Sequence, residues 1–187
     1  VRLPILSGLG VVVFDSVYEG LSSVAGMLET DPSAIELLDN LGLTLCRGVP
    51  QYARLLSTFI DGNPNCVLIT EFRGDSEQEL QMKVDKLKSR LDSHGVKTRT
   101  VAAINPDIQG NVWAVRKVGL GLMMSIKGDY KPIPFIEDAA VPPEHLADYV
   151  TEIQRFCAEI GTDRVPMYAH ASAGCLHIRP LINAKVA

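Results

Sequence analysis

The residues of this chain that are best suited to chemistry lie near its C-terminus, in the stretch 167–180 (MYAHASAGCLHIRP). This stretch holds two of the four histidines, His170 and His177, on either side of a run of small residues. On one unbroken strand their rings would point to opposite faces, about 23 Å apart along the chain. If residues 171–174 instead form a tight turn, His170 ends one strand and His177 lies on the returning strand of a hairpin.

Alternation after the turn predicts that Cys175, His177 and Arg179 share one face of the returning strand. Leu176 and Ile178 would then face the core. Two neutral imidazoles beside a guanidinium suit a divalent metal with an anionic ligand held against it. Two histidines do not complete a metal site, so a polar hairpin whose histidines only form hydrogen bonds remains an open alternative. The cysteine has the same two interpretations, a soft metal ligand or a small strand residue.

A second candidate is Arg116, in a helix predicted from Asn105 to about Ser125. Trp113 and Leu120 fall near the same face of this helix as the arginine. An arginine on an apolar stripe either lays its stem over apolar surface or points into a pocket to bind a carboxylate in bidentate fashion. The sequence leaves both interpretations open.

The bulk composition narrows the class of protein. The chain has 187 residues, of which 47% are hydrophobic and 21% charged, as in an ordinary globular protein of one large or two small domains. A net charge of −4 gives no reason to expect nucleic acid, and no apolar run approaches the ~20 residues of a membrane span. The four cysteines form no CxxC pair, so we expect free thiols in a reducing cytoplasm. The start without Met and the end soon after a predicted strand lead us to expect a truncated fragment.

The elements that must position these residues follow from hydrophobic periodicity. Residues 9–38 and 66–102 are each predicted as strand, helix and strand. No GxGxxG or GxxxxGK[ST] motif accompanies them, so they offer no nucleotide-phosphate site. Paired βαβ units of this kind predict an α+β, ferredoxin-like fold, with an antiparallel sheet covered by helices on one face.

The second half of the chain, residues 105–187, carries the candidate site. After the Arg116 helix we predict a strand over residues 133–136 and a helix over residues 144–160, followed by the hairpin of the two histidines. Glu137 and Asp138, between the strand and the helix, are expected to position the proline-containing turn that follows them rather than to bind a metal. The predicted fold is therefore two βαβ units plus a C-terminal hairpin.

Three segments of this second half occur in a characteristic order: VWAVRK at 112–117, IEDAAVP at 136–142 and AHASAGCLH at 169–177. Together they resemble the family pattern W-x-x-R, E-D-x-x-V-P and G-H-x-G-D-G-N-L-H. This pattern belongs to the C-terminal (cap) domain of FAD-linked oxidases of the vanillyl-alcohol oxidase class. Within the class, the chain is most similar to the group of D-lactate dehydrogenase, the flavoprotein of glycolate oxidase, and D-2-hydroxyglutarate dehydrogenase. The AGCLHIRP variant resembles the large bacterial form, which is fused to an iron-sulfur region.

The resemblance implies that residues 1–187 are a single cap domain of a larger flavoprotein, whose FAD-binding domain is absent here. It implies oxidation of a small 2-hydroxy acid to the 2-oxo acid. Electrons would pass from FAD to an iron-sulfur region or electron carrier, in the cytoplasm or peripherally at the inner membrane. His170 and His177 correspond to ligands of a divalent metal such as zinc, and Arg116 to the clamp on the substrate carboxylate. Lys131 is the nearest candidate for a carboxylate-binding lysine.

The chain departs from the family pattern at several positions. Ser172 and Ala173 replace its Gly and Asp, and Cys175 replaces its Asn. The family's third metal ligand, a Glu in an E-H-G segment, would follow the end of this chain. Arg179 stands where relatives that bind dicarboxylates can carry Asn, and it is a further candidate for binding the substrate carboxylate.

One alternative of a different class is a ferredoxin-like regulatory or assembly module without catalysis. The two βαβ units alone fit this alternative equally well. Such a module needs neither an arginine on an apolar helix stripe nor a hairpin with paired histidines, so these two features favour the cap domain.

Overall fold

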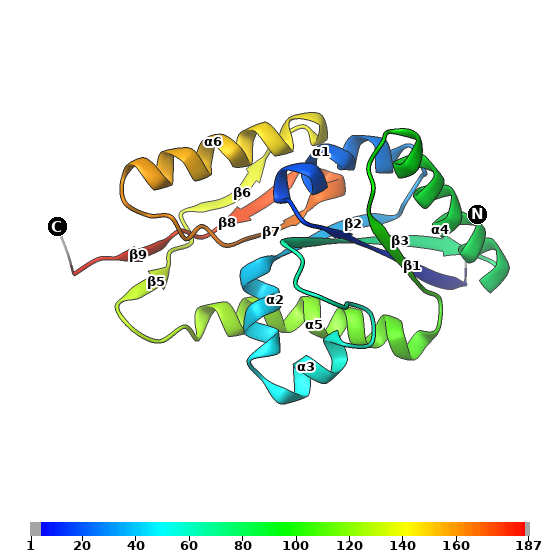
Figure 1. Cartoon of the computed structure of the whole chain (residues 1–187), viewed down its shortest axis with the longest axis horizontal. Coiled ribbons are helices and arrows are strands. Elements are labelled where there is room, and N and C mark those ends of the chain that lie inside the picture. Colours follow the sequence, from blue (N-terminus) through cyan, green and yellow to red (C-terminus); the bar gives the residue numbers. More distant parts are fainter. Residues whose placement is uncertain (1–4, 186–187) are drawn as a thin grey trace.

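Seven strands form one sheet in the computed structural model of the chain, which describes residues 5–185 (Figure 1). The strands are β1 (Leu6–Phe14), β2 (Ala34–Asp39), β3 (Cys66–Gly74), β4 (Arg99–Ala103), β5 (Tyr130–Pro132), β6 (Ile136–Ala140), β7 (Met167–His170), β8 (Cys175–Ile178) and β9 (Leu181–Asn183). The helices are α1 (Val17–Leu28), α2 (Asn40–Arg47), α3 (Pro50–Leu56), α4 (Glu77–Ser93), α5 (Pro106–Met124) and α6 (Leu146–Glu159). The order across the sheet is β4-β1-β3-β2-β7-β8-β6, and neighbouring strands run antiparallel.

The first four strands of this order form the two predicted strand–helix–strand units. The β1–α1–β2 unit interleaves with the β3–α4–β4 unit, because β3 lies between β1 and β2 in the sheet. The apolar strand residues meet in register, with Leu68 of β3 opposite Val12 of β1 on one side and Leu37 of β2 on the other. The order β4-β1-β3-β2 is that of the ferredoxin-like fold, so this prediction is confirmed.

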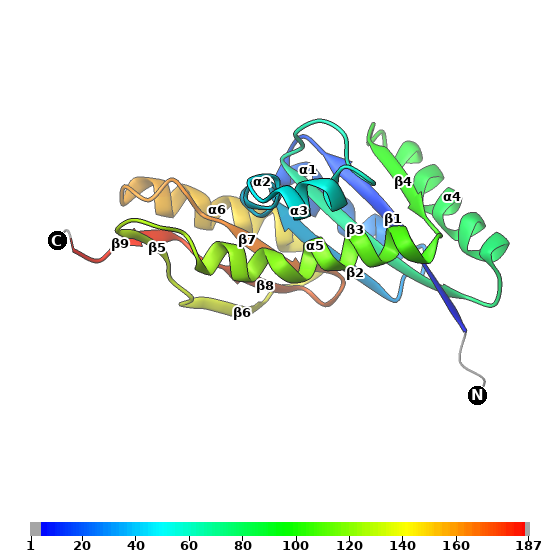
Figure 2. The same ribbon diagram turned by 90° about the horizontal axis from the view of Figure 1, so that it is seen from below.

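Helices cover both faces of the sheet. Leu68 and Phe72 of β3 pack in a core with α1, α4 and α6, whereas Val67 and Ile69 of the same strand pack with α2, α3 and α5. Seen from below, α5 crosses the sheet with α2 and α3 beside it (Figure 2). The prediction of helices on one face only is wrong. Helices α2 and α3, which connect β2 to β3, join α5 in this second layer.

Side-chain caps fix where the main helices begin. Ser16 accepts a hydrogen bond from the third residue of α1, and Asn105 accepts one in the first turn of α5. At α4, the Ser76 hydroxyl accepts from the Glu79 backbone, and the Glu79 carboxylate accepts from the backbone N–H of Asp75 (2.8 Å). This reciprocal pair is a variant of the capping box, in which the carboxylate accepts from the residue just before the cap. None of the helices in residues 5–185 is long and apolar enough to cross a membrane.

A buried carboxylate joins the ferredoxin-like half to the C-terminal hairpin. Asp39, 7% exposed, ends β2 and caps α2. One of its oxygens accepts from the backbone N–H of Gly42 and the other from that of Met167, each at 2.9 Å. Burial raises the pKa of Asp39 to about 6, against the lowering effect of these two hydrogen bonds. Asp39 therefore holds the first residue of β7 beside the end of β2.

The segment between α5 and α6 differs from the prediction. The strand expected over residues 133–136 is wrong, because β5 ends at Pro132 and β6 begins only at Ile136. Strand β5 pairs with β9 in a separate two-stranded sheet, and β6 pairs with β8 at the edge of the main sheet. Pro132 and Pro134 have no N–H to donate to a ladder, which explains why one continuous strand does not form there.

Candidate functional site

The hairpin of the two histidines forms as predicted. Strand β7 ends at His170, a 3-10 turn covers Ala171–Ala173, and β8 begins at Cys175. Gly174 lies between them in the left-handed region, with a φ of 66°. A Cβ on Gly174 would clash with the carbonyl oxygen of Val141. Only glycine meets both requirements at this position.

Because side chains alternate along β7 and β8, the hairpin has one face in the hydrophobic core and one face that carries the polar site residues. One face packs into the core beneath α6, through Met167, Ala169, Leu176 and Ile178. On the other face Tyr168 lies directly opposite His177, and His170 directly opposite Cys175. The predicted division of β8 into a core face and a polar face is therefore confirmed.

Each histidine ring is oriented by a carboxylate. The two ring centroids lie 5.3 Å apart, with the rings nearly perpendicular. Nδ1 of His170 lies 2.7 Å from a carboxylate oxygen of Glu36, the β2 residue that is paired with His170 in the sheet. Nδ1 of His177 lies 2.7 Å from a carboxylate oxygen of Glu137. Because a carboxylate only accepts, each Nδ1 donates, and in the neutral imidazole each Nε2 then keeps its lone pair. Metal-binding histidines are commonly held in this way.

An irregularity in β6 brings two acidic residues to the same imidazole. The register of β6 against β8 shifts between Ile136 and Ala139, and Asp138 there has a positive φ of 52°. In a regular strand Glu137 and Asp138 would point to opposite faces. Here both reach His177, with Asp138 Oδ1 at 3.3 Å from Nδ1. The prediction that these two residues merely position the following turn is wrong.

Two largely buried arginines complete the site. Arg116 of α5 pairs with Glu36 (2.8 Å), and Arg179 pairs with Glu137. Their side chains are only 14% and 12% exposed, so Arg116 does not extend its head group to the surface. The Nε of each arginine is buried without a hydrogen-bond partner among residues 5–185. Buried donors usually have a partner, so these two Nε–H groups carry an unmet hydrogen-bonding capacity at the site.

Tyr168, at the centre of this arrangement, was missed by sequence reasoning. The guanidinium carbons of Arg116 and Arg179 lie 5.0 and 5.6 Å from its ring centroid, and the His177 ring lies at 4.8 Å. Burial raises the pKa of its hydroxyl. The available signal was alternation before the turn, which places Tyr168 on the face of His170. Glu36 was also missed, although a charged residue inside a predicted strand marks it.

Cys175 lies beside the free nitrogen of His177. Its Sγ is 4.0 Å from His177 Nε2. Asp138, Cys175 and His177 each offer a ligand atom within 4.8 Å of the others, a group that does not include His170. Burial raises the pKa of the Cys175 thiol, and the nearby carboxylates Asp138, Glu137 and Glu36 raise it further.

Lys131 lies apart from these residues, in β5. Its ammonium nitrogen donates to the carbonyl oxygen of Ile126 (2.6 Å), just beyond the C-terminal end of α5. No hydrogen bond or ion pair within residues 5–185 joins Lys131 to the two histidines or to Arg116.

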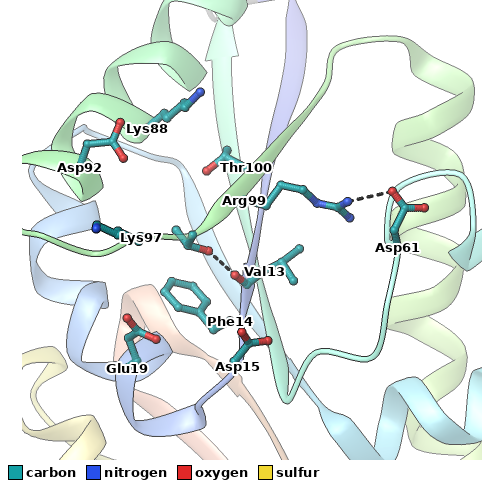
Figure 3. A pocket seen from close by; sticks show the side chains of 11 residues that line it. Val13, Phe14, Asp15, Glu19, Asp61, Lys88, Asp92, Lys97, Arg99 and Thr100 are labelled. Carbon is teal, nitrogen blue, oxygen red and sulfur yellow. Dashed lines mark hydrogen bonds and ion pairs between the residues drawn. The ribbon is translucent and has the colours of Figure 1, made fainter.

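A cavity of about 610 Å³ lies elsewhere, between β4, α4 and the end of β1 (Figure 3). Its charged lining residues are Asp15, Glu19, Asp61, Lys88, Asp92, Lys97 and Arg99. Arg99 and Asp61 pair with each other at 2.8 Å. Four acidic and three basic side chains line this cavity, so it favours neither an anion nor a cation, and none of the candidate site residues lines it.

Comparison with known proteins gives a consistent picture. Residues 6–187 match the family described as FAD linked oxidases, C-terminal domain. The chain is 35% identical over 191 residues to D-2-hydroxyglutarate dehydrogenase of Escherichia coli (strain K12), an alignment that covers 97% of this chain and 19% of the relative. It is 33% identical to the enzyme of the same name from Pantoea ananatis (strain AJ13355), over 92% of this chain and 18% of the relative. The chain thus spans about a fifth of the length of these relatives.

A solved structure of alkyldihydroxyacetonephosphate synthase has a similar fold. It superposes with a TM-score of 0.61 and 14% sequence identity, over 99% of this chain and 38% of the synthase. At this identity the likeness concerns the fold alone.

Proposed function

Because the chain belongs to the family of FAD-linked oxidase C-terminal domains, we propose that it is the substrate-binding cap domain of an FAD-dependent dehydrogenase that oxidises a 2-hydroxy acid to the 2-oxo acid. One observation carries the proposal. Two Arg–Glu–His units, Arg116–Glu36–His170 and Arg179–Glu137–His177, converge on one face of the hairpin. A regulatory or assembly module has no need to bury two guanidiniums and an imidazole in this way, so we favour the enzyme.

The two arginines point to the kind of substrate. Arg116 and Arg179 flank Tyr168, and each has a buried Nε without an acceptor among the described residues. Guanidinium groups bind carboxylates strongly and with defined geometry. Two such groups suit a substrate with two carboxylates, as the relatives named D-2-hydroxyglutarate dehydrogenase suggest. We therefore propose a D-2-hydroxyglutarate-type dicarboxylate. Lys131 would join in binding only if its bond to Ile126 opened.

A divalent metal such as zinc fits the histidines. Glu36 and Glu137 hold the Nδ1 atoms, so the Nε2 atoms of His170 and His177 are the available ligands. When bound, such an ion would lower the pKa of the substrate hydroxyl. The arginines hold the carboxylates and so orient the carbon that is oxidised. FAD, which we propose is bound mainly by another domain of the same polypeptide, supplies the electron chemistry.

The rest of the polypeptide would take the electrons onward. Since the chain spans only 19% of the Escherichia coli relative, there is room for an iron-sulfur region or for a surface that meets an electron carrier. All four cysteines are free thiols, which supports the proposed cytoplasmic location. Peripheral attachment to the inner membrane stays a prediction from the resemblance.

The proposal is tested on the full-length protein. Its flavin content is measured, and the flavin is then mixed anaerobically with a panel of D- and L-2-hydroxy acids. We expect the flavin absorbance to bleach with a D-2-hydroxy acid, and fastest with D-2-hydroxyglutarate. A protein that purifies without flavin and is bleached by none of these acids would favour the assembly module instead.

A further inference from the structure

The free nitrogen of His177 faces a thiol. Sγ of Cys175 lies 4.0 Å from His177 Nε2. A tetrahedral zinc ion with bonds of about 2.3 Å to sulfur and about 2.1 Å to nitrogen holds these two atoms about 3.6 Å apart. The observed separation therefore needs only a small side-chain adjustment to take an ion between the two atoms.

Asp138 provides a third ligand atom. Its carboxylate lies within 4.8 Å of the ligand atoms of both Cys175 and His177. Its Oδ1 lies 3.3 Å from Nδ1 of His177, and the side chain is 82% exposed, so it can rotate from Nδ1 toward an ion at Nε2 without disturbing the core. The β6 irregularity directs Asp138 to this face, where a regular strand would direct it away.

The residues around Asp138, Cys175 and His177 hold the ligands in place, as they do in protein metal sites. Glu137 holds Nδ1 of His177, and Arg179 in turn pairs with Glu137, so the imidazole is fixed from behind. Cys175 is fixed by strand pairing on both sides, to β7 and to β6. Together with His170, whose ring centroid lies 5.3 Å from that of His177, these residues make a ligand set of the size and type that zinc takes in proteins.

Local charge also favours a cation. The carboxylates around the thiol are those of Glu36, Glu137 and Asp138. The two guanidiniums of the site, on Arg116 and Arg179, each pair with one of the first two. The carboxylate of Asp138 has no guanidinium partner among the described residues and pairs only with the His177 ring, so it adds negative charge beside the thiol.

We propose that Cys175 is a thiolate ligand of an ion held at His177, with Asp138 as the third protein ligand, and that this ligand set selects a thiophilic divalent ion such as zinc. The inference rests on the proposed function in placing the ion at His177, and it adds Cys175 and Asp138 to the ligands of that ion. A thiolate favours zinc over hard ions such as Mg²⁺ or Mn²⁺, which prefer oxygen ligands.

X-ray absorption at the zinc edge of the zinc-loaded full-length protein tests the ligand set directly. The measurement reads only zinc, so iron-sulfur clusters do not interfere. We expect a sulfur neighbour at about 2.3 Å that is lost in Cys175→Ser. Zinc affinity should fall at least about tenfold in Cys175→Ser and in Asp138→Asn, with little change in Mn²⁺ affinity for the cysteine variant. Asp129→Asn, which changes an exposed aspartate paired with Lys185, is the matched control and should bind zinc normally.

A second measurement does not depend on any variant. Alkylation of Cys175 by iodoacetamide, followed by mass spectrometry of the wild-type protein, should slow when zinc is added. Zinc bound through nitrogen and oxygen neighbours alone, an unchanged spectrum in Cys175→Ser, or alkylation that zinc does not slow would each overturn the thiolate ligand. The proposed dehydrogenase function would survive any of these results, because flavin bleaching in the same preparation tests it separately.

Discussion

Replacing Glu137 with glutamine tests whether the Arg–Glu–His units are structural supports of the site. Glu137 accepts from Nδ1 of His177 and pairs with Arg179, and these three side chains are 24%, 12% and 12% exposed. Glutamine has nearly the same shape but no charge. The change therefore leaves a largely buried guanidinium without its counter-ion.

The loss in free energy of unfolding can be estimated from the burial of these three side chains. Removing one partner of a fully buried ion pair costs about 3–5 kcal/mol. Because Glu137 keeps some contact with water, we expect about 2–3 kcal/mol for the lost pair. The glutamine oxygen can still accept from His177, so the weakened imidazole bond adds at most about 1 kcal/mol. The free energy of unfolding should thus fall by about 2–4 kcal/mol, a large part of the usual 5–15 kcal/mol.

Urea unfolding of the 187-residue chain, followed through the fluorescence of its single tryptophan, measures this loss. We expect a midpoint about 1–2 M lower with an unchanged slope. The control is Glu152→Gln on α6, which removes an exposed carboxylate that also pairs with an arginine. Its midpoint should not move, because exposed ion pairs contribute little. If Glu137→Gln unfolds at the same urea concentration as Glu152→Gln, the Glu137 pair does not support the site and our reasoning is wrong.

Three further predictions concern the same half of the molecule. In the full-length protein, Arg116→Ala should lower kcat/KM for a 2-hydroxy acid at least about tenfold, roughly the loss of one charge-assisted hydrogen bond; unchanged kinetics would remove Arg116 from the site. His170→Ala combined with His177→Ala should abolish metal binding, and equal metal content by elemental analysis would contradict the metal role. Burial raises the pKa of Asp39 from 3.8 to about 6, so the folded state keeps a proton that the unfolded state has released. The free energy of unfolding should therefore fall by about 3 kcal/mol as the pH rises through this window, and stay level above it. Asp39→Asn should lack this fall, which urea unfolding at a series of pH values would show; parallel pH profiles would exclude Asp39 as its source.

Local patterns in the sequence were enough to predict the ferredoxin-like half and the hairpin. Strand alternation separates Leu176 from Cys175 and His177 whatever the rest of the chain does, because successive side chains of a strand point to opposite faces. Helix starts at Ser16 and Ser76 were likewise readable, since a cap satisfies backbone donors only a few residues away.

The pairing of each histidine with its carboxylate depended on the tertiary structure. Glu36 lies 134 positions before His170 and 80 before Arg116, and the three meet only because β7 adds to the edge of β2 and α5 packs across that edge. The direction of Asp138 is set by the shifted register between β6 and β8, which no periodicity in residues 136–140 reveals.

The sequence by itself thus determined which residues carry the chemistry and which face of each strand they occupy, because propensity and alternation act between near neighbours along the chain. Only the tertiary structure decided what each charged group pairs with. Ion pairs in a mostly buried site form between strands and helices that are distant in sequence, and their partners are chosen by sheet order and register.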